Sequence, residues 1–310
     1  MPETVKVSMN YRVEHCRTSG GLTRAVLVAS FVVVVGCQGE AGPGSHQPAA
    51  SNGAARSAMT VEELHAALKA KNPAYNGQAQ TQLGGDEIRI VGLSETGVVD
   101  ISPLAGLSLQ VLDLRGCAVT DLAPLRRMPL RQLYLEQTKV ADLSPLRGLH
   151  IEELYLSNTP VLDIDALRGM PLRQLNLVRT GVSQIDALKG APLQSLWLNQ
   201  TRVADISPLA GAPLQSLTLE ACPVTDVSVV RQLPSLRRLH IGDTQVTDLT
   251  PIAGLPLERL VFSPSRITRG LDAARVLPAC RELATVYNDE QNQTMPPAEF
   301  WRAYDAGALR

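Results

Sequence analysis

Hydrophobic and polar residues follow a pattern that repeats every 21 residues along most of the chain. The second copy reads LRQLYLEQTKVADLSPLRGLH. Its Leu133 and Leu135 alternate with more polar residues, which predicts a short strand whose leucines point inward. The outward positions of that strand are Gln132, Tyr134 and Glu136. The eight full copies begin at Leu109, Leu130, Ile151, Leu172, Leu193, Leu214, Leu236 and Leu257.

Strands that recur at this spacing are expected to stack in parallel, about 4.8 Å apart. A single unit cannot bury its own leucine face, so the stability of the stack is a sum of interfaces between neighbours. The period and the LxxLxL start of each unit resemble the leucine-rich-repeat family. The segments DISPLAGL and DLSPLRGL resemble its internalin-like subclass, with threonine after the strand. The resemblance implies an α/β solenoid with parallel strands on the concave face, short 3₁₀ turns on the convex side and a helical cap at each end.

The ends of such a stack need caps, because an open end exposes core residues and a strand edge. We expect residues 59–87 to form the N-terminal cap, residues 88–280 the repeats and residues 281–310 the C-terminal cap. In the first cap, Thr60 and Glu63 have the spacing of a capping box, in which each side chain bonds the other residue's backbone N–H. A helix is therefore predicted to start there.

The C-terminal cap is predicted to contain a second helix. Pro297 suits a first helical turn, and Gly307 suits a helix end. Phe300, Trp301 and Tyr304 are expected to form the apolar face that seals the last repeat. An aromatic ligand site at these residues is the less favoured alternative.

The N-terminal segment has the pattern of an export signal. Arg17 and Arg24 precede the apolar run AVLVASFVVVVG, which is too short to cross a bilayer core that takes roughly 20 residues. Basic residues before a short apolar stretch are typical of a signal peptide, predicted here over residues 1–36. The sequence VVGC, which ends at Cys37, resembles the bacterial lipobox, and this resemblance implies that Cys37 carries lipid such as palmitate. An ordinary secretory signal with an incidental cysteine is the alternative.

Residues 37–58 are rich in Gly, Ala, Ser and Pro, with almost no large apolar side chain. Such a segment is expected to be a flexible tether that spans roughly 25 Å. Several acyl chains would hold the protein on a membrane surface. Gln38 follows the cysteine, and by the sorting rule known for enteric lipoproteins this favours the outer membrane or the cell surface. The pattern leaves open whether translation starts at Met1 or Met9.

One column of small polar residues follows the strands. It comprises Thr96, Cys117, Thr138, Thr159, Thr180, Thr201, Cys222, Thr244 and Ser265. We expect these side chains to bond the neighbouring turn, as asparagine does in many repeat families. Cys117 and Cys222 lie five repeats apart, about 24 Å by strand spacing. A disulfide needs Cα atoms within about 7 Å, so both thiols are expected to be unpaired.

A second column is acidic. It comprises Asp100, Asp121, Asp142, Asp163, Asp205, Asp226 and Asp248. Aspartate before such a turn accepts backbone N–H bonds and starts a short 3₁₀ segment. Calcium binding is the disfavoured alternative, because Gln184 interrupts the column and is a poor substitute for a carboxylate ligand.

Composition and charge argue against several functions. The chain has 29 basic and 30 acidic residues, which does not favour a general electrostatic grip on nucleic acid. The five cysteines and five histidines are scattered, with no spacing typical of metal ligands. Neither a Ser-His-Asp set nor paired carboxylates converge in the repeat register. We therefore expect neither an enzyme nor a bound metal or cofactor.

The outward strand positions are the candidate binding surface. The central column runs Asp113, Tyr134, Tyr155, Asn176, Trp197, Thr218, His240 and Val261. Three aromatic residues are expected to be displayed on a face that does not need them for folding, and Tyr and Trp are enriched at binding hot spots. A protein partner is expected to contact Tyr134, Tyr155, Trp197, Asn176, Glu136, Asn199, Arg238 and His240. Alternatively, Tyr134 and Tyr155 stack on each other across adjacent strands.

Trp197 is expected to lack an aromatic neighbour, and His240 taken alone suits an ordinary surface residue. The middle of the face is expected to be mildly acidic, through Glu136, Glu153 and Glu220, and its C-terminal end basic. The function predicted from all these patterns is a monomeric, membrane-anchored module of the bacterial envelope that binds another protein. A structural or accessory envelope protein without a fixed ligand is the alternative.

Overall fold

The computed structural model describes residues 7–17, 23–33, 59–285 and 294–309. The chain divides into two compact units, Met1–Ala55 and Arg56–Arg310. In the first unit, β1 (Val7–Arg17) and β2 (Thr23–Val33) pair as an antiparallel hairpin. Both strands fall within the predicted signal peptide of residues 1–36, and their pairing does not test an export role. Cys37 and the predicted tether over residues 37–58 lie outside the described residues, so the signal peptide and the lipid anchor stay predictions.

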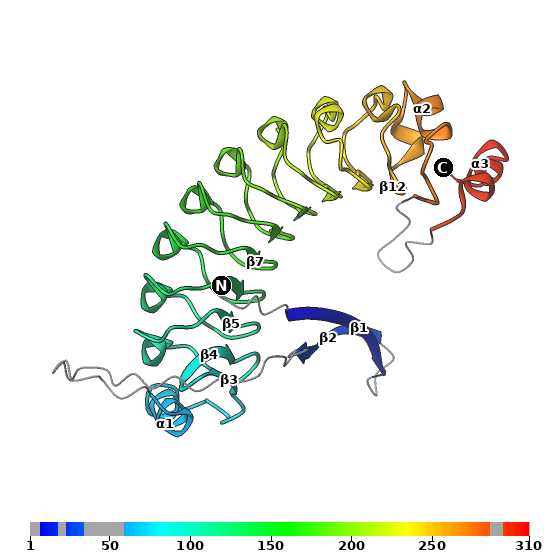
Figure 1. Cartoon of the computed structure of the whole chain (residues 1–310). Helices are drawn as coiled ribbons and strands as arrows, with labels where there is room; N and C mark the ends of the chain where they lie inside the picture. The colour runs from blue at the N-terminus through cyan, green and yellow to red at the C-terminus, as the bar shows by residue number, and fades with distance from the viewer. Residues whose placement is uncertain (1–6, 18–22, 34–58, 286–293, 310) are drawn as a thin grey trace, which may run out of the picture. The chain divides into compact units, whose positions relative to one another are not determined.

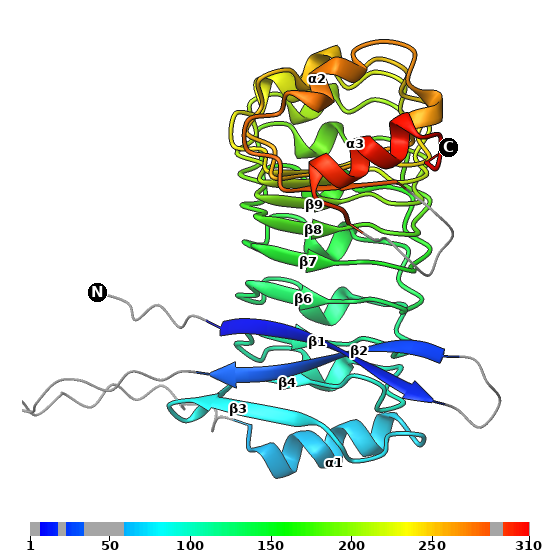
Figure 2. The ribbon, with the colours of Figure 1, turned by 90° about the vertical axis from the view of Figure 1, so that its right-hand side faces the viewer.

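The second unit is built on one sheet of eleven strands. Its strands are β3 (Gln80–Gly84), β4 (Glu87–Gly92), β5 (Val111–Asp113), β6 (Gln132–Tyr134), β7 (Glu153–Tyr155), β8 (Gln174–Asn176), β9 (Ser195–Trp197), β10 (Ser216–Thr218), β11 (Arg238–His240), β12 (Arg259–Val261) and β13 (Glu282–Ala284). β3 pairs antiparallel with β4, and every later pair is parallel. Within this unit the strands line the inner side of a curved stack (Figure 1), and Figure 2 shows β6 to β9 lying one above the next.

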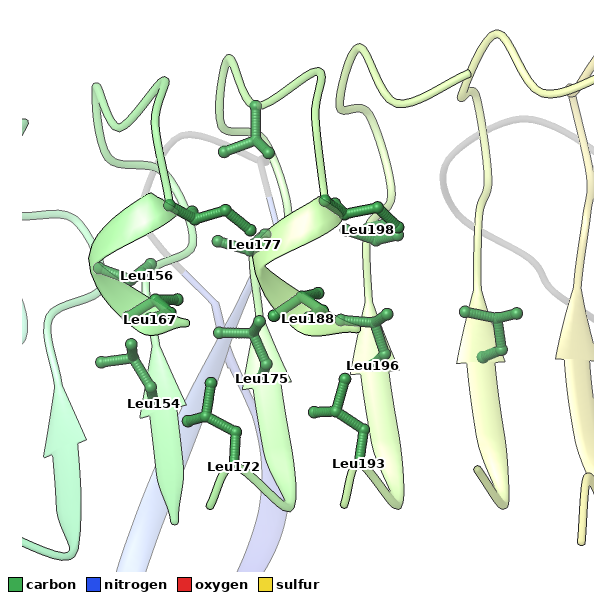
Figure 3. Packing of buried hydrophobic residues seen from close by; sticks show 14 of the residues in the cluster. Leu154, Leu156, Leu167, Leu172, Leu175, Leu177, Leu188, Leu193, Leu196 and Leu198 are labelled. Carbon is green, nitrogen blue, oxygen red and sulfur yellow. The ribbon is translucent and has the colours of Figure 1, made fainter. Parts of the chain in front are cut away.

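The inward leucines form one continuous spine. Each strand pairs in register, so that Leu133 lies opposite Leu154, and Leu154 opposite Leu175. The spine comprises Leu112, Leu133, Leu154, Leu175, Leu196, Leu217, Leu239, Leu260 and Leu283, each at most 1% exposed. Figure 3 shows the members from β7, β8 and β9 aligned between flanking leucines of the same coils. Burying each such side chain contributes roughly 1.5–3 kcal/mol to the stability of the stack. The aligned leucines confirm the repeat architecture predicted from the sequence.

Short 3₁₀ helices form the outer side of the stack. They span Ser102–Leu104, Ala123–Leu125, Ser144–Leu146, Asp165–Leu167, Asp186–Leu188, Ser207–Leu209, Ser228–Gln232, Thr250–Ile252 and Pro264–Arg266. Asp142 precedes one of them, and its Oδ1 accepts the Ser144 backbone N–H at 2.8 Å. That bond holds the pKa of Asp142 below its ordinary value. The other six aspartates of the acidic column accept the equivalent N–H, so the predicted turn-starting role is confirmed.

The threonines and cysteines of the small polar column are buried, whereas Ser265 is exposed. The two buried residue types bond differently. Thr138 Oγ1 donates to the Leu135 carbonyl of its own coil at 2.7 Å. Cys117 Sγ donates instead to the Leu93 carbonyl of the preceding coil at 2.9 Å. The expected bond to a neighbouring turn is therefore made by cysteine, whereas the short hydroxyl of threonine reaches the carbonyl three residues back. Cys117 and Cys222 are both buried and unpaired, as expected.

The N-terminal helix α1 (Val61–Lys71) starts where the capping box predicted. The Glu63 backbone N–H donates to Thr60 Oγ1 at 3.1 Å, and the Thr60 N–H donates to Glu63 Oε2 at 2.8 Å. Leu64 and Leu68, which belong to α1, are fully buried on the side of the helix that faces the core. α1 thus covers the core at this end of the stack.

At the C-terminal end the sheet extends beyond residue 280, the expected end of the repeats. β13 pairs in parallel with β12, Leu283 lying opposite Leu260. The outer edge of β13 is covered in turn by Met295, which exchanges backbone hydrogen bonds of 2.9 and 2.7 Å with Leu283. The last part of the chain therefore continues the sheet before it caps it.

The C-terminal seal is aromatic. α3 (Pro297–Asp305) carries Phe300 and Trp301, which are 1% and 8% exposed. Their rings lie 5.7 and 6.3 Å from the ring of Phe262 in the preceding coil. These contacts confirm the predicted sealing role of α3. The short helix α2 (Leu271–Arg275) adds a cation–π contact, in which the Arg275 guanidinium lies 4.4 Å from the Trp301 ring centroid. No helix among the described residues is long and apolar enough to cross a membrane.

Candidate functional site

The outward side chains of the sheet form three columns, which together are called the strand face here. The first column runs Gln132, Glu153, Gln174, Ser195, Ser216, Arg238, Arg259 and Glu282. The central column runs Asp113, Tyr134, Tyr155, Asn176, Trp197, Thr218, His240 and Val261. The third column, two residues further along each coil, includes Arg115, Glu136, Ser157, Val178, Asn199 and Glu220. All eight residues predicted to contact a partner lie on this face.

Two of those residues are not displayed as expected. Tyr134 is only 2% exposed and Tyr155 only 7%. Their rings stack with centroids 5.0 Å apart and an interplanar angle of 18°. The Tyr155 hydroxyl also donates to Gln174 Oε1 at 2.7 Å. The expectation of display is wrong because side chains on adjacent strands cover these rings, and the stacking alternative describes the pair.

Trp197 has an aromatic neighbour after all. Its ring centroid lies 6.2 Å from that of Tyr155, two strands away. Asn176 stands between them in the column, and its Oδ1 accepts the Val178 backbone N–H at 3.0 Å. Because the Asn176 side chain is short and bonds its own coil, the Trp197 indole can contact the Tyr155 ring across the intervening strand. Trp197 remains half-buried, so part of the indole faces solvent.

A polar group lies beside Trp197 on β9 to β11. Asn199 Nδ2 donates to Glu220 Oε2 at 3.0 Å, and the same oxygen lies 3.9 Å from His240 Nδ1. Asn199 Oδ1, Thr218 Oγ1 and His240 Nε2 are buried and have no hydrogen-bond partner among the described residues. Burial, aided by the charge of Arg259, lowers the pKa of His240 to about 4. His240 is thus a neutral, largely buried group, and its reading as an ordinary surface residue is wrong.

The N-terminal part of the strand face carries carboxyl groups in partly buried surroundings. Asp113 is 2% exposed and is fully engaged by Arg115, whose Nη2 lies 2.5 Å from its Oδ2. Glu136, next in the third column, has a buried Oε2 without a partner among the described residues, and burial raises its pKa to about 7. Burial also raises the pKa of Glu153. The charge of Arg115 acts on Glu136, and Glu153 is hydrogen-bonded by Gln132 and Tyr134.

The C-terminal part of the face carries two arginines. Arg238 and Arg259 lie opposite each other on β11 and β12. Arg259 Nε approaches Glu282 Oε2 at 3.6 Å, and Arg238 is exposed, with no ion pair in the described part of the chain. Like charges directly opposite one another on neighbouring strands repel, so this end of the face is electrostatically suited to an anion.

The potential metal ligands among the described residues are dispersed, and two of the thiols are buried. None of the described His, Cys, Asp and Glu side chains group in threes that could hold a metal ion. The thiols of Cys117 and Cys222 are buried in the core, where desolvation raises their pKa. A thiol held in its neutral form is a poor nucleophile. Both thiols therefore lie in the core and not on the strand face.

Several residues of the strand face were named in the sequence only as neighbours of the expected contacts. Thr218, Glu220 and Glu153 belong to the same columns as the predicted contacts, and the 21-residue register was the signal that could have included them. The engagement of Asp113 by Arg115, with the guanidinium 5.7 Å from the Tyr134 ring centroid, had no sequence signal beyond proximity.

Comparisons with known proteins agree with this architecture. No protein-family model matches the chain, and no curated protein sequence matches it either. Among solved structures, the chain is similar to the internalin InlF of Listeria monocytogenes, with 24% identity over 73% of this chain and 74% of that one, at a TM-score of 0.55. It is also similar to internalin C2 of the same organism, with 25% identity over 72% of this chain and 92% of that one, at a TM-score of 0.52.

A third likeness, to the structure of PEPR1-AtPEP1, has 17% identity and a TM-score of 0.56 over 68% of this chain and 33% of that one. At that identity only the fold is shared. The leucine spine, the outer 3₁₀ helices and these likenesses together identify the chain as a leucine-rich-repeat solenoid similar in fold to the internalins.

Proposed function

We propose that this protein is a binding module that holds a protein partner on the strand face, at Trp197 and the polar group beside it. One observation carries the proposal. Asn199, Thr218 and His240 each keep one buried polar atom without a partner among the described residues, on three adjacent coils of the same face. A half-buried indole lies next to them.

The energetics favour this site over the buried tyrosine pair. A buried donor or acceptor without a partner costs about 1–3 kcal/mol, which a partner's hydrogen bonds would recover on binding. Tryptophan is enriched among residues whose loss weakens complexes most, and Trp197 still presents part of its ring. Tyr134 and Tyr155 then act as support, because their stack and the Tyr155 contact hold the indole in place. Likeness in fold to InlF and internalin C2 is compatible with this role and does not name the partner.

The test is site-specific cross-linking in the cell that makes the protein. A photoreactive amino acid at Ser216, which borders the polar group on β10 without being one of its members, should cross-link to one defined protein, and the same group at the exposed Lys189 on the outer side should not. Trp197→Ala should remove the cross-link while the circular dichroism spectrum is unchanged. Equal cross-linking from both positions, or none from position 216, would favour the alternative of a structural protein without a fixed ligand.

We also propose that the module is anchored in the bacterial envelope by lipid on Cys37. The motif VVGC, the preceding apolar run and the Gly- and Ala-rich residues after it support this. Labelled palmitate should be incorporated into the full chain and not into Cys37→Ser. The wild-type protein should sediment with membranes, with a mass that lacks residues 1–36. A Cys37→Ser protein that stays equally membrane-bound and labelled would overturn the anchor, leaving the strand-face proposal untouched.

A further inference from the structure

The row of ring side chains in the central column of the strand face is interrupted beside Trp197. On one side the indole is supported by Tyr155, whose ring centroid lies 6.2 Å away. On the other side the next residue of the column is Thr218, opposite Trp197 on β10, and His240 follows on β11. A small side chain therefore stands between the indole and the imidazole.

The position over Thr218 is wide enough for one side chain of a partner. Trp197 and His240 are two strands apart, which is about 10 Å at about 4.8 Å per strand. A side chain in van der Waals contact with both neighbours needs about 3.5–4 Å on each side, or about 7–8 Å in all. One side chain of ordinary thickness therefore fits between the indole and the imidazole.

The unpartnered atoms around this position are mainly hydrogen-bond acceptors. Asn199 Nδ2 donates to Glu220 Oε2 at 3.0 Å, which fixes the orientation of the amide and leaves Asn199 Oδ1 as an acceptor. The same Glu220 oxygen faces His240 Nδ1 at 3.9 Å. The neutral imidazole is therefore expected to carry its proton on Nδ1, so that Nε2 is also an acceptor. Thr218 Oγ1 can either donate or accept.

The surroundings favour a neutral donor over a charged one. Burial and the charge of Arg259 lower the pKa of His240 to about 4, so a positive charge is disfavoured at this position. A carboxylate has no N–H to donate, and it would leave the acceptors of Asn199 and His240 unpaired. Arg238 is exposed in the neighbouring column, where solvent screens its attraction for an anion. A primary amide is neutral and carries two N–H donors and one acceptor.

We infer that the partner inserts the side-chain amide of a glutamine or asparagine over Thr218, with its methylene stem packed on the Trp197 indole. This inference rests on the proposed function and names the group that the partner presents at that site. The amide N–H groups would donate to Asn199 Oδ1 and His240 Nε2, and its carbonyl would accept from Thr218 Oγ1. Asn199, Thr218 and His240 are all partly exposed, so rotation about a side-chain torsion turns these atoms toward the amide.

The probe is a phage-displayed library of random short peptides, selected on the full-length protein. Enriched peptides should share one glutamine or asparagine. Replacing that residue by methionine in a synthetic peptide should weaken binding about tenfold, because the hydrogen bonds to the acceptors are lost and the stem is kept. Binding should change by less than about twofold between low and high salt, since the recognised group is neutral. Enriched peptides that share a charged residue instead, or a methionine peptide that binds equally well, would overturn the inference.

Variants of the protein locate the bound amide. Thr218→Phe fills the position between the indole and the imidazole and should weaken binding more than about tenfold. Lys189→Phe, on the outer side of the stack, is the matched control and should bind like wild type. Thr218→Val keeps the shape of the side chain and removes only its hydroxyl, so it should weaken binding about threefold. Unchanged binding to a folded Thr218→Phe protein would contradict the assigned position.

The outcomes separate this inference from the proposed function. Peptides that need Trp197 but share no amide would overturn the inference and leave the proposed site standing. Peptides whose binding is unchanged in Trp197→Ala would remove the site itself. A library from which no peptide is enriched would overturn the side-chain amide as the recognised group, and the cross-link from position 216 would still decide whether a protein partner binds.

Discussion

At the scale of single residues, the pH dependence of stability is expected to come largely from two groups on the strand face with opposite effects. Burial raises the pKa of Glu136 from 4.5 to about 7, so folding favours its protonated form. Burial lowers the pKa of His240 from 6.5 to about 4, so folding favours its neutral form as well. As the pH rises, Glu136 lowers the free energy of unfolding and His240 raises it, so the two effects partly cancel in the wild-type protein.

Glu136 should make the protein more stable in acid. Its favourable contribution is fully present below pH 4.5 and is lost as the pH rises through about 7, since the ionised form is disfavoured only in the folded state. The free energy of unfolding of wild type relative to Glu136→Gln should therefore fall by about 2–3 kcal/mol between those limits. Urea titrations at a series of pH values measure this difference. A difference that does not change with pH would show that the carboxylate is solvated when folded.

His240 should have the opposite effect. In the unfolded chain His240 is protonated below its ordinary pKa of 6.5, whereas in the folded protein it stays neutral until the pH falls to about 4. The stability of wild type relative to His240→Gln should accordingly decrease by about 2–3 kcal/mol as the pH falls across that interval. The imidazole resonances of the folded protein, followed by NMR, give a direct measurement. Titration of His240 near its ordinary value would mean that Glu220 holds the charged form.

At the scale of elements, the N-terminal cap rests on a small number of bonds. The side chains of Thr60 and Glu63 each supply one bond of the capping box, and α1 buries Leu64 and Leu68 against the first coil. Thr60→Ala should lower the free energy of unfolding by about 1 kcal/mol, whereas Thr60→Ser keeps the hydroxyl and should remain close to wild type. Chemical denaturation of the three proteins decides this. Equal losses in both variants would assign the effect to the threonine methyl group and not to the cap bond.

The elements that sequence reasoning predicted well are those in which one local chemistry recurs in every coil. The leucine spine and the Asp-started turns need only their own coil and an identical neighbour, so the 21-residue pattern sufficed. Burial of Tyr134 and Tyr155 depends on side chains from adjacent strands, which the period does not describe. The contact between Trp197 and Tyr155 likewise depends on a small residue in the strand between them.

A backbone feature of the same coils had no sequence signal at all. The residue directly before the small polar column adopts a left-handed conformation, with φ of 59° at Gln137, 57° at Asn158 and 54° at Ala221. Glycine usually marks this region, yet the column holds chemically unrelated residues because the turn geometry is imposed by the flanking coils. The candidate site was therefore predictable as a set of outward positions, but not in its exposure or its internal contacts.

At the scale of the whole stack, neighbour interfaces are additive, so removing one complete coil should leave a folded protein. Deletion of residues 172–192 joins two equivalent positions and lets β7 pair with β9 in register, with Leu154 opposite Leu196. The free energy of unfolding should fall by about 2 kcal/mol, at roughly 0.1 kcal/mol per residue removed. Removal of only residues 172–181 is the control, and it should unfold the stack because the leucine register is lost.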